Sequence, residues 1–291
     1  MKTIVIALDG LDYELVKEFE LENIIQEETG EINNHEGIKK IKTSELFASF
    51  ITGETYEEHG VEGLAKWSNP KIQKFEDTVE SIWFFDKFRE LRQAVFETVS
   101  LFNASQRKHT KEDLEAESFF EEMNDSRAMF VPAYNPSMTW VIRAGTAPLK
   151  FGFSSEDVVD YWDSREYEHR KRELFSELEN DIIPPRDLLM CHFHRPDMHH
   201  HMYGDKNLGN FDRFRLKELY EETDEFAREV KKKALEKGYE RVIFMSDHGL
   251  PEAEGHNRNA FYSSNKPLFP DTIPHITDFH DVLVKESETN Q

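Results

Sequence analysis

Three short apolar runs, each followed closely by a carboxylate or a cluster of histidines, constrain the fold more than any other feature of the sequence. The runs are Thr3–Leu8 (TIVIAL), Leu188–Phe193 (LLMCHF) and Arg241–Met245 (RVIFM). Uninterrupted apolar runs of this length are typical of strands buried on both faces of a parallel sheet. Because ligand sites of open parallel sheets lie at the carboxyl ends of the strands, the residues that follow these runs are candidates for a functional site.

Segments with helical periodicity separate these runs. Apolar residues recur at helical spacing between Leu11 and Phe19, directly after the first run. Longer helices are predicted over Ser154–Asp181, which begins with a capping signal, and over Asp212–Lys237, which is amphipathic. The alternation predicts one α/β domain over residues 1–291, with a mostly parallel sheet covered by helices on both faces.

Weaker local signals predict three more elements. Gly37–Lys42 is predicted as a strand, and Ser44–Thr52 as a helical turn that ends at Gly53. Ala128–Val131 is predicted as a strand that leads into a proline-containing loop. Loops of this kind line active sites when they follow a strand.

The middle of the chain predicts an insertion in the sheet-and-helix pattern. The segment Trp83–Met123 is charged and strongly helical, and its phenylalanines and leucine form an apolar face. We therefore expect a small helical cap over residues 67–127.

Charge and cysteine content disfavour several classes of protein. Acidic residues outnumber basic ones by 58 to 36, giving a formal net charge of −22. Such a charge repels nucleic acid and anionic membranes, so we expect no basic nucleic-acid groove. Cys191 is the single cysteine and has no partner for an intrachain disulfide. No segment approaches the length of a membrane span, so we predict a cytoplasmic protein without a targeting peptide.

The polar residues after the three runs have the chemistry of metal ligands. Asp9 follows the first run, a tract with five histidines begins at the end of the second, and Asp247 and His248 follow the third. Taken singly, each is equally typical of a turn or a surface loop. Together they bring carboxylate and imidazole groups, which suit zinc or manganese, to one edge of the predicted sheet.

The spacing of these residues resembles a known family. Asp197 and His201 stand in PDMHHHMYG, which resembles the metal-binding PDxxxHxxG loop of the type I phosphodiesterase and nucleotide pyrophosphatase branch of the alkaline phosphatase superfamily. Ser246–Gly249 resembles the SDHG motif of that family. The segment KTSELFASFITGETYEEHGV resembles its nucleophile segment, with Thr43 nine residues before a Thr-Gly pair. His256 resembles the last metal-binding histidine.

The resemblance implies an alkaline phosphatase-like fold with two divalent metal ions, most simply zinc, with manganese or iron as alternatives. It implies that Thr43 attacks phosphorus and forms a phosphoryl-threonine, which water then hydrolyses. The implied ligands of one ion are Asp9, Thr43, Asp247 and His248, and those of the other are Asp197, His201 and His256.

The nucleophile segment departs from the family pattern at three positions. Ser44, Glu45 and Leu46 stand where many relatives have Pro, or Pro and Asn, after the nucleophile. Ser44 is therefore a rival nucleophile, and the asparagine that holds substrate in relatives is missing. Asn135, as a donor to a phosphoryl oxygen, and Arg195, as a partner of a second phosphate, are candidates to bind substrate in its place. The alternatives are a turn residue and a solvated surface arginine.

These observations predict a metal-dependent phosphohydrolase that cleaves phosphodiester or nucleotide pyrophosphate bonds in a small-molecule phosphate ester or nucleotide. Diesters are favoured over monoesters because no Lys or Arg is evident to neutralise the additional charge of a monoester. A phosphomonoesterase is the alternative within the same chemistry. A catalytically silent protein that binds a phosphate ligand is the alternative from another class.

Overall fold

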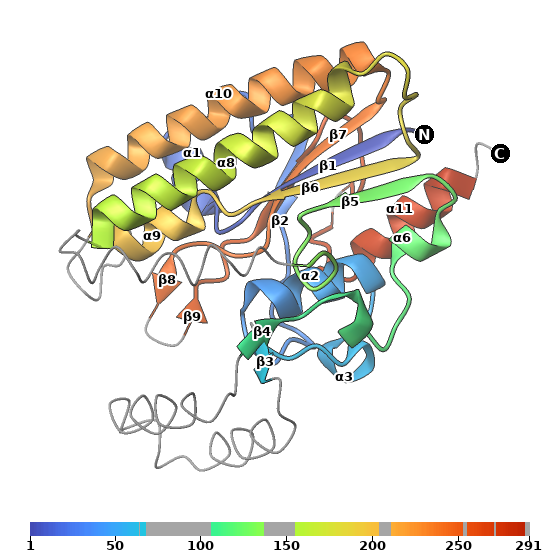
Figure 1. Cartoon of the computed structure of the whole chain (residues 1–291), viewed down its shortest axis with the longest axis horizontal. Helices are drawn as coiled ribbons and strands as arrows, with labels where there is room; N and C mark the ends of the chain where they lie inside the picture. The colour runs from blue at the N-terminus through green and yellow to red at the C-terminus, as the bar shows by residue number, and fades with distance from the viewer. Residues whose placement is uncertain are drawn as a thin grey trace.

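A mostly parallel sheet forms the centre of the molecule in the computed structural model, which describes residues 1–63, 65–67, 106–136, 155–203, 211–252, 255–270 and 272–288 (Figure 1). Within these ranges the sheet has six strands in the order β2-β10-β7-β1-β6-β5. All neighbouring strands pair in parallel except β10, which is antiparallel to β7 and β2. The strands are β1 (Thr3–Leu8), β2 (Glu28–Glu31), β5 (Ser126–Met129), β6 (Leu188–Phe193), β7 (Arg241–Ser246) and β10 (Phe261–Ser264).

Helices cover both faces of this sheet (Figure 1). One face is covered by α1 (Tyr13–Glu18), α8 (Ser155–Glu179) and α10 (Arg213–Lys237), and the other by α2 (Thr43–Thr52), α6 (Phe119–Glu122) and α11 (Asp278–Glu288). The shorter elements are α3 (Tyr56–His59), β3 (Ala65–Trp67), β4 (Gln106–Lys108), η2 (Lys111–Asp113), α9 (Asp197–Tyr203), β8 (Pro251–Glu252) and β9 (Gly255–His256). The predicted α/β class, with helices on both faces, is confirmed.

Burial on both faces explains why the three apolar runs lack polar alternation. Every residue of β1, β6 and β7 is buried. Because successive side chains of a strand point to opposite faces, Ile4 and Ile6 pack under α8 and α10, whereas Val5 and Ala7 pack against α2. A strand between two helical layers therefore carries apolar residues on both of its faces.

The two long helices begin and end where the sequence predicts, within two residues. Asp212 caps α10 by accepting hydrogen bonds from the N–H groups of Phe214 and Arg215, and Gly238 ends it in the left-handed region at φ 103°. Gly53 ends α2 in the same way at φ 72°. A glycine adopts this conformation without the penalty that a Cβ atom imposes.

The strand predicted over Gly37–Lys42 is wrong. The N–H groups of Lys39 and Lys40 donate to the Glu45 carboxylate, as does the N–H of Gly63 at 3.0 Å. These backbone donors are therefore engaged by a side chain rather than by a neighbouring strand. The nearby sheet edge is formed by β2, which the sequence pattern did not reveal.

Two other predictions need correction. The strand predicted over Ala128–Val131 is β5, which lies two residues earlier and ends at Met129. The histidine-rich tract predicted as a loop contains the helix α9, which begins at Asp197. A seven-residue helix rich in histidine has no apolar periodicity in its sequence, so its pattern resembles that of a loop.

The cap predicted over residues 67–127 falls mainly on residues 68–105, which lie outside the described part of the chain. On either side of them, β3 and β4 pair as an antiparallel hairpin. The helix predicted over Trp83–Met123 is replaced by β4, η2 and α6 in its described part. The cap itself stays a prediction.

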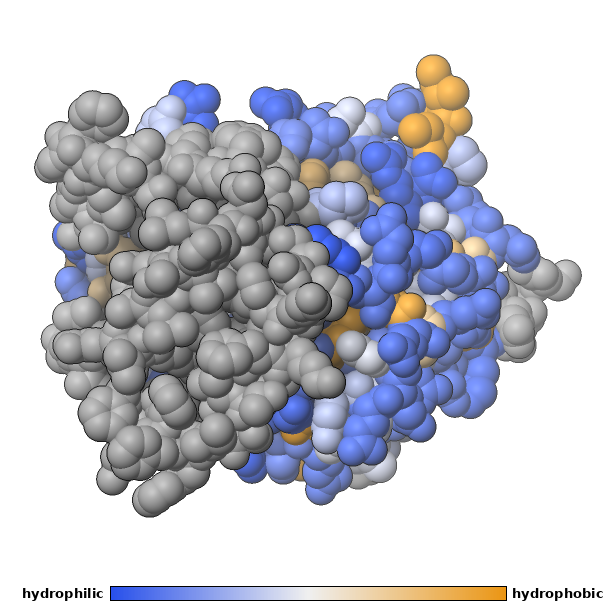
Figure 2. Space-filling model, turned by 60° about the horizontal axis from the view of Figure 1, so that its bottom comes forward, coloured by the Kyte–Doolittle hydropathy of each residue, from blue (hydrophilic) through white to orange (hydrophobic). Residues whose placement is uncertain are grey.

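The surface that Figure 2 shows for the described residues is largely hydrophilic. Figure 2 shows mainly hydrophilic residues on one face, with apolar residues in small separate spots. Within the described ranges, none of the helices combines the length and apolar character that crossing a membrane demands. The large apolar residues that stand exposed there are Ile25, Tyr161, Ile182, Phe214, Leu235 and Ile273.

A buried carboxylate, that of Asp12, joins the start of α1 to the chain that follows β7. Asp12 is 1 % exposed. Its oxygens accept hydrogen bonds from the N–H groups of Glu14, Leu15 and Leu250 at 3.0 to 3.2 Å and from the side-chain amides of Asn257 at 2.7 Å and Asn259 at 3.0 Å. A single side chain thus caps a helix and holds two segments beside the site described below.

Replacing Asp12 by Ala is expected to lower the free energy of unfolding by about 3 kcal/mol, because a helix cap and several buried donors lose their acceptor together. Urea denaturation of the metal-free protein measures this loss. Glu14→Ala is the matched control, since Glu14 is an exposed acid that pairs with Lys17 at the surface, and its loss is expected to cost less than about 0.5 kcal/mol. Equal stability of the two variants would contradict the role of Asp12.

Candidate functional site

Asp9, Asp247 and His248 meet at the carboxyl edge of the sheet, as the sequence predicts. Asp9 follows β1 and Asp247 follows β7, and these strands pair in parallel register. The His248 Nε2 atom lies 3.3 Å from Asp9 Oδ1 and 3.4 Å from Asp247 Oδ2. All three side chains are buried, and one potential ligand atom of each lies within 4.8 Å of the other two.

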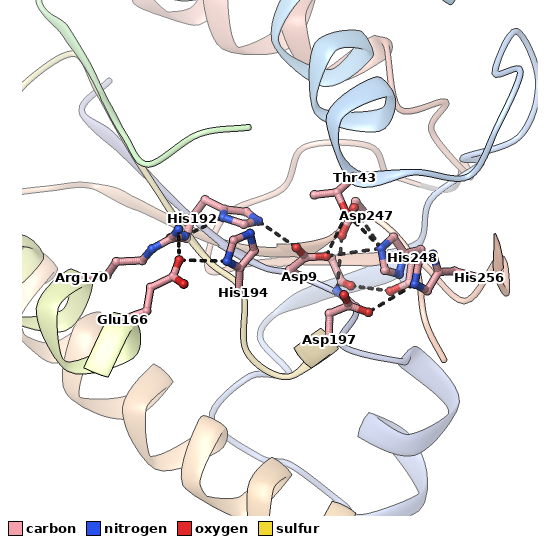
Figure 3. Close-up of polar contacts among 12 residues, drawn as sticks. Asp9, Thr43, Glu166, Arg170, His192, His194, Asp197, Asp247, His248 and His256 are labelled. Atoms are coloured by element: carbon pink, nitrogen blue, oxygen red, sulfur yellow. Dashed lines mark hydrogen bonds and ion pairs between the residues drawn. The ribbon is translucent and has the colours of Figure 1, made fainter. Parts of the chain in front are cut away.

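Asp197, His201 and His256 form a second group beside the first. Asp197 begins α9, and His201 lies one helical turn later; their closest atoms, Oδ2 and Nε2, are 3.5 Å apart. His256 Nε2 lies 3.3 Å from Asp197 Oδ1 and 3.3 Å from His201 Nε2. The rings of His256 and His248 stack with centroids 3.8 Å apart, so the two groups adjoin (Figure 3). The His201 side chain is 54 % exposed, which leaves the second group open to solvent.

Gly10 allows the two groups to approach each other. Its φ is 73°, and a Cβ atom at this position would lie 2.9 Å from Asp197 Cβ. The N–H of Asp197 also donates to the carbonyl of Asp9 at 3.0 Å. The turn after β1 therefore requires glycine for its backbone conformation and for the space that Asp197 occupies.

Thr43 lies against the first group. It begins α2, and its Oγ1 is 3.4 Å from both Asp9 Oδ1 and His248 Nε2. The amino terminus of a helix carries N–H groups without helical partners, which favours an anion in front of it. Glu45, two residues further on in the same first turn of α2, accepts hydrogen bonds on its carboxylate from the N–H groups of Lys39, Lys40 and Gly63. The backbone of the neighbouring loops thus holds Glu45, the glutamate that departs from the family pattern, through three hydrogen bonds.

The chemistry of these residues fits bound cations. Asp247 Oδ2 and Asp197 Oδ1 are buried oxygens that accept no hydrogen bond from the described residues. His248 Nδ1 lies 3.0 Å from the carbonyl of Gly249, so this nitrogen is a donor, and Nε2 can offer a lone pair beside two carboxylates once a cation displaces its proton. Acceptors that converge in this way repel one another unless a cation lies between them, and histidine with carboxylate is a donor set for zinc, manganese or iron.

The electrostatics of the first group lead to the same inference. Burial, together with the nearby carboxylates of Asp9 and Asp197, raises the pKa of Asp247 to about 8. Burial opposes the charge of His248, but the Asp247 and Asp9 carboxylates prevail and raise its pKa to about 10. Although burial acts in the opposite direction, contacts from His192 and His248 hold the pKa of Asp9 below its ordinary value. Protons thus balance the buried carboxylates in the metal-free protein, and a cation can displace them.

Two lysines near the site escaped the sequence analysis. Burial lowers the pKa of both Lys42 and Lys108, and the Asp197 carboxylate opposes this effect in each case. Asp9 also acts on Lys108. The position of Lys42 immediately before Thr43 is a signal from which the sequence could have placed it near the site. Lys108 lies on β4, far from every motif in the sequence, so no signal in the sequence could have revealed its place near the site.

His192 also escaped the sequence analysis, because it lies within an apolar run that reads as core. Its side chain is completely buried, and its Nε2 atom lies 3.3 Å from Asp9 Oδ2. Burial lowers the pKa of His192 to about 3. A histidine in a buried strand is more often a structural residue, so only its contact with Asp9 indicates a connection with the site.

The two predicted substrate-binding residues are not brought into contact with the two groups. The Arg195 guanidinium pairs with Asp163 at 2.8 Å and Glu222 at 3.0 Å, on α8 and α10. The Asn135 side chain accepts a hydrogen bond from the N–H of Val131 at 2.8 Å and so closes a turn after β5. Their role in binding substrate stays a prediction that these contacts do not favour.

Comparison with known proteins agrees with this geometry. The family model for type I phosphodiesterase / nucleotide pyrophosphatase matches residues 3–268. The chain belongs to this family. The membership in the alkaline phosphatase superfamily that the motifs predicted is therefore confirmed, and no curated protein matches the chain.

Solved structures of mouse ectonucleotide pyrophosphatase / phosphodiesterase 5 are similar in fold. One has a TM-score of 0.50 at 15 % identity, and the similarity covers 86 % of this chain and 57 % of that protein. Another, of an inactive variant in complex with AMP, has a TM-score of 0.48 at 14 % identity with the same coverage. The chain thus spans less than two thirds of the mouse protein, and the likeness concerns the fold alone.

Proposed function

We propose that this chain is a metal-dependent hydrolase of phosphodiester or nucleotide pyrophosphate bonds, with Thr43 as its nucleophile. The observation that carries the proposal is the position of Thr43 Oγ1, 3.4 Å from Asp9 Oδ1 and from His248 Nε2, at the amino terminus of a helix. A hydroxyl held beside potential metal ligands and facing an anion-binding helix end suits attack on phosphorus. Membership of the phosphodiesterase family supports this chemistry.

The two groups of ligands are proposed to hold two divalent ions, with zinc the first candidate, in a cytoplasmic protein. Bound there, the ions supply a lowered pKa for the nucleophilic hydroxyl and positive charge for the phosphoryl oxygens. We assign Asp9, Thr43, Asp247 and His248 to one ion and Asp197, His201 and His256 to the other.

Thr43 and the amino terminus of α2 are assigned the remaining steps of the reaction. Thr43 Oγ1 forms a bond to phosphorus as the bond from phosphorus to the leaving oxygen breaks, which gives a phosphoryl-threonine. The amino terminus of α2 faces the charge that develops on the phosphoryl oxygens. Water then hydrolyses the phosphoryl-threonine and restores the Thr43 hydroxyl. The open side of the second group, at His201, is where we place the entry of substrate.

Phosphomonoester hydrolysis is a second candidate, which Lys42 and Lys108 favour. A monoester carries more negative charge than a diester, and a nearby ammonium group can neutralise it. The Asp197 carboxylate affects the pKa of both lysines, so their ammonium groups lie within electrostatic range of the site. Neither lysine shows a direct contact with the two groups of ligands.

Hydrolysis of two chromogenic esters distinguishes these functions. With the zinc-loaded protein, we expect kcat/KM for bis-p-nitrophenyl phosphate to exceed that for p-nitrophenyl phosphate by about 10-fold or more, because neither Lys42 nor Lys108 contacts the two groups of ligands to neutralise the additional charge of a monoester. Asp247→Ala serves as the control and should lose both activities. Preference for the monoester would favour the second function, and bound zinc without turnover of either ester would favour a silent binding protein.

A further inference from the structure

A buried chain of contacts runs from α8 to the far side of Asp9 (Figure 3). It comprises Glu166 and Arg170 on α8, His192 on β6, and Asp9 itself. Asp9 Oδ1 faces the proposed metal group and Thr43, whereas Asp9 Oδ2 faces His192 Nε2 at 3.3 Å. The two oxygens of this carboxylate therefore have different partners.

The register of the sheet places His192 on the correct side for this contact. His192 lies opposite Ala7 in the parallel pair of β6 and β1, and Asp9 follows Ala7 by two residues. Residues two apart in a strand project to the same face. The edge of the His192 ring meets Phe47 of α2 with centroids 4.9 Å apart, which packs the ring from the side opposite α8.

Arg170 determines which nitrogen of His192 carries the proton. Arg170 Nη1 lies 2.9 Å from His192 Nδ1 and donates to the carbonyl of His192 at 2.7 Å. A guanidinium group has donors only, so His192 Nδ1 must act as an acceptor. The proton of the neutral ring is therefore on Nε2, where it faces Asp9 Oδ2.

An acidic partner and an aromatic ring hold Arg170 in turn. Arg170 pairs with Glu166, whose carboxylate also contacts His194 Nδ1 at 2.8 Å. The guanidinium lies over the ring of Phe130, 5.0 Å from its centroid, and the side chain is 8 % exposed. A buried arginine with these contacts has little freedom to turn away from His192.

We propose that Arg170 and His192 are positioning residues that orient Asp9. The Nε2 atom of His192 faces Asp9 Oδ2 across 3.3 Å, and Oδ1 is left to face Thr43 and the metal group, so that Asp9 offers one oxygen in a fixed direction. The role of these residues in metal binding rests on the proposed function. The tautomer of His192 does not depend on that function, because the contact with Arg170 alone determines it. Groups that hold a metal ligand in this way typically contribute 10- to 100-fold to metal affinity or activity.

Zinc affinity tests the proposal without relying on turnover. His192→Phe keeps the size of the ring and its packing on Phe47 but removes the donor, and we expect zinc affinity, measured in competition with a chromogenic chelator, to fall by about 10- to 100-fold. His192→Gln places an amide donor near Asp9 and should recover affinity to within about threefold of the wild type. If His192 had a purely structural role, His192→Phe and His192→Gln would have similar melting temperatures and would also bind zinc with similar affinities.

Arg170→Met keeps His192 but removes the guanidinium that sets its tautomer, together with the pair that this group forms with Glu166, and we expect about a 10-fold loss of zinc affinity. Arg186→Met is the matched control, because Arg186 pairs with Glu177 at 2.9 Å and Asp125 at 2.7 Å near the opposite end of β6. It should match the wild type in zinc affinity even where it loses stability. Equal affinities of the wild type, His192→Phe and Arg170→Met would overturn the proposal.

The tautomer is read directly from imidazole nitrogen-15 spectra of the metal-free full chain, in which His192→Gln identifies the His192 signals. We expect a protonated Nε2 in the wild type and a mixture of tautomers in Arg170→Met. A protonated Nδ1 in the wild type would overturn the proposal even if His192→Phe failed to fold. Absence of zinc binding by the wild type would instead contradict the proposed function, so the two failures are distinguishable.

Discussion

Replacing Thr43 by Ala is expected to lower kcat for diester hydrolysis by about 10⁴-fold or more, because the reaction loses its nucleophile. Zinc affinity should largely survive, since Asp9, Asp247 and His248 remain around the first ion and the second group is unchanged. The steady-state rate with bis-p-nitrophenyl phosphate and a zinc competition assay measure the two quantities. A variant with undiminished activity would reject Thr43 as the nucleophile.

Two neighbouring substitutions sharpen this test. Thr43→Ser keeps the hydroxyl and should retain measurable turnover. Ser44→Ala removes the rival hydroxyl and should stay within about 10-fold of the wild type, because Thr43 is the hydroxyl that contacts Asp9 and His248. Mass spectrometry of acid-quenched protein should find the phosphoryl group on the peptide that contains Thr43 and lose it in Thr43→Ala. A loss in Ser44→Ala as large as that in Thr43→Ala would transfer the role to Ser44.

Removing the metal is expected to make the protein less stable as the pH rises from 7 to 8.5. The pKa of Asp247 is raised from 3.8 to about 8 and that of His248 from 6.5 to about 10. In this pH window the folded chain keeps protons that the unfolded chain has released, so the free energy of unfolding falls with pH. The slope is about 1 kcal/mol per pH unit for each group that holds its proton. Histidines with lowered pKa, such as His192, are neutral in the folded chain and about a quarter protonated in the unfolded chain at pH 7, so they oppose this slope weakly at pH 7 and hardly at all at pH 8.5.

Bound metal should reverse this dependence. The ligands bind in their deprotonated forms, so metal binding releases protons and zinc affinity rises by about tenfold per pH unit for each proton displaced. Calorimetric melting between pH 7 and 8.5, with zinc and with a chelator, measures the difference. Asp247→Asn is the control, because it cannot ionise and its metal-free form should show a weaker pH dependence. A metal-free wild type that becomes more stable over this range would contradict the assignment.

The fold was largely predictable because its central strands are buried on both faces. The runs at β1, β6 and β7 carry apolar residues on both faces, and that pattern is local in the sequence. The segment Gly37–Lys42 failed as a strand for the opposite reason. Its backbone donors are satisfied by the Glu45 carboxylate, a contact that strand propensity does not encode.

The motif residues of the site were predictable because each stands next to a predicted strand end or at a characteristic spacing. Asp9, Asp197 and Asp247 are brought together as expected, since the parallel register aligns the ends of β1, β6 and β7. Arg195 stands beside the metal loop in sequence, yet it faces acids on α8 and α10. Proximity to a motif in the sequence does not determine the direction of a side chain, because tertiary packing determines which rotamer the side chain adopts.

Local pattern was thus sufficient for the strands, the long helices and the carboxylates and histidines at the strand ends, since each leaves its signature within a few residues. Only tertiary packing could reveal that His192, an apparent core residue of β6, contacts Asp9, and that Arg170 from α8 sets its tautomer. Packing likewise brings Lys108 of β4 within electrostatic range of Asp9 and Asp197. These contacts join residues that are distant in the sequence, and they form because the sheet register and the helix above it bring their backbones together.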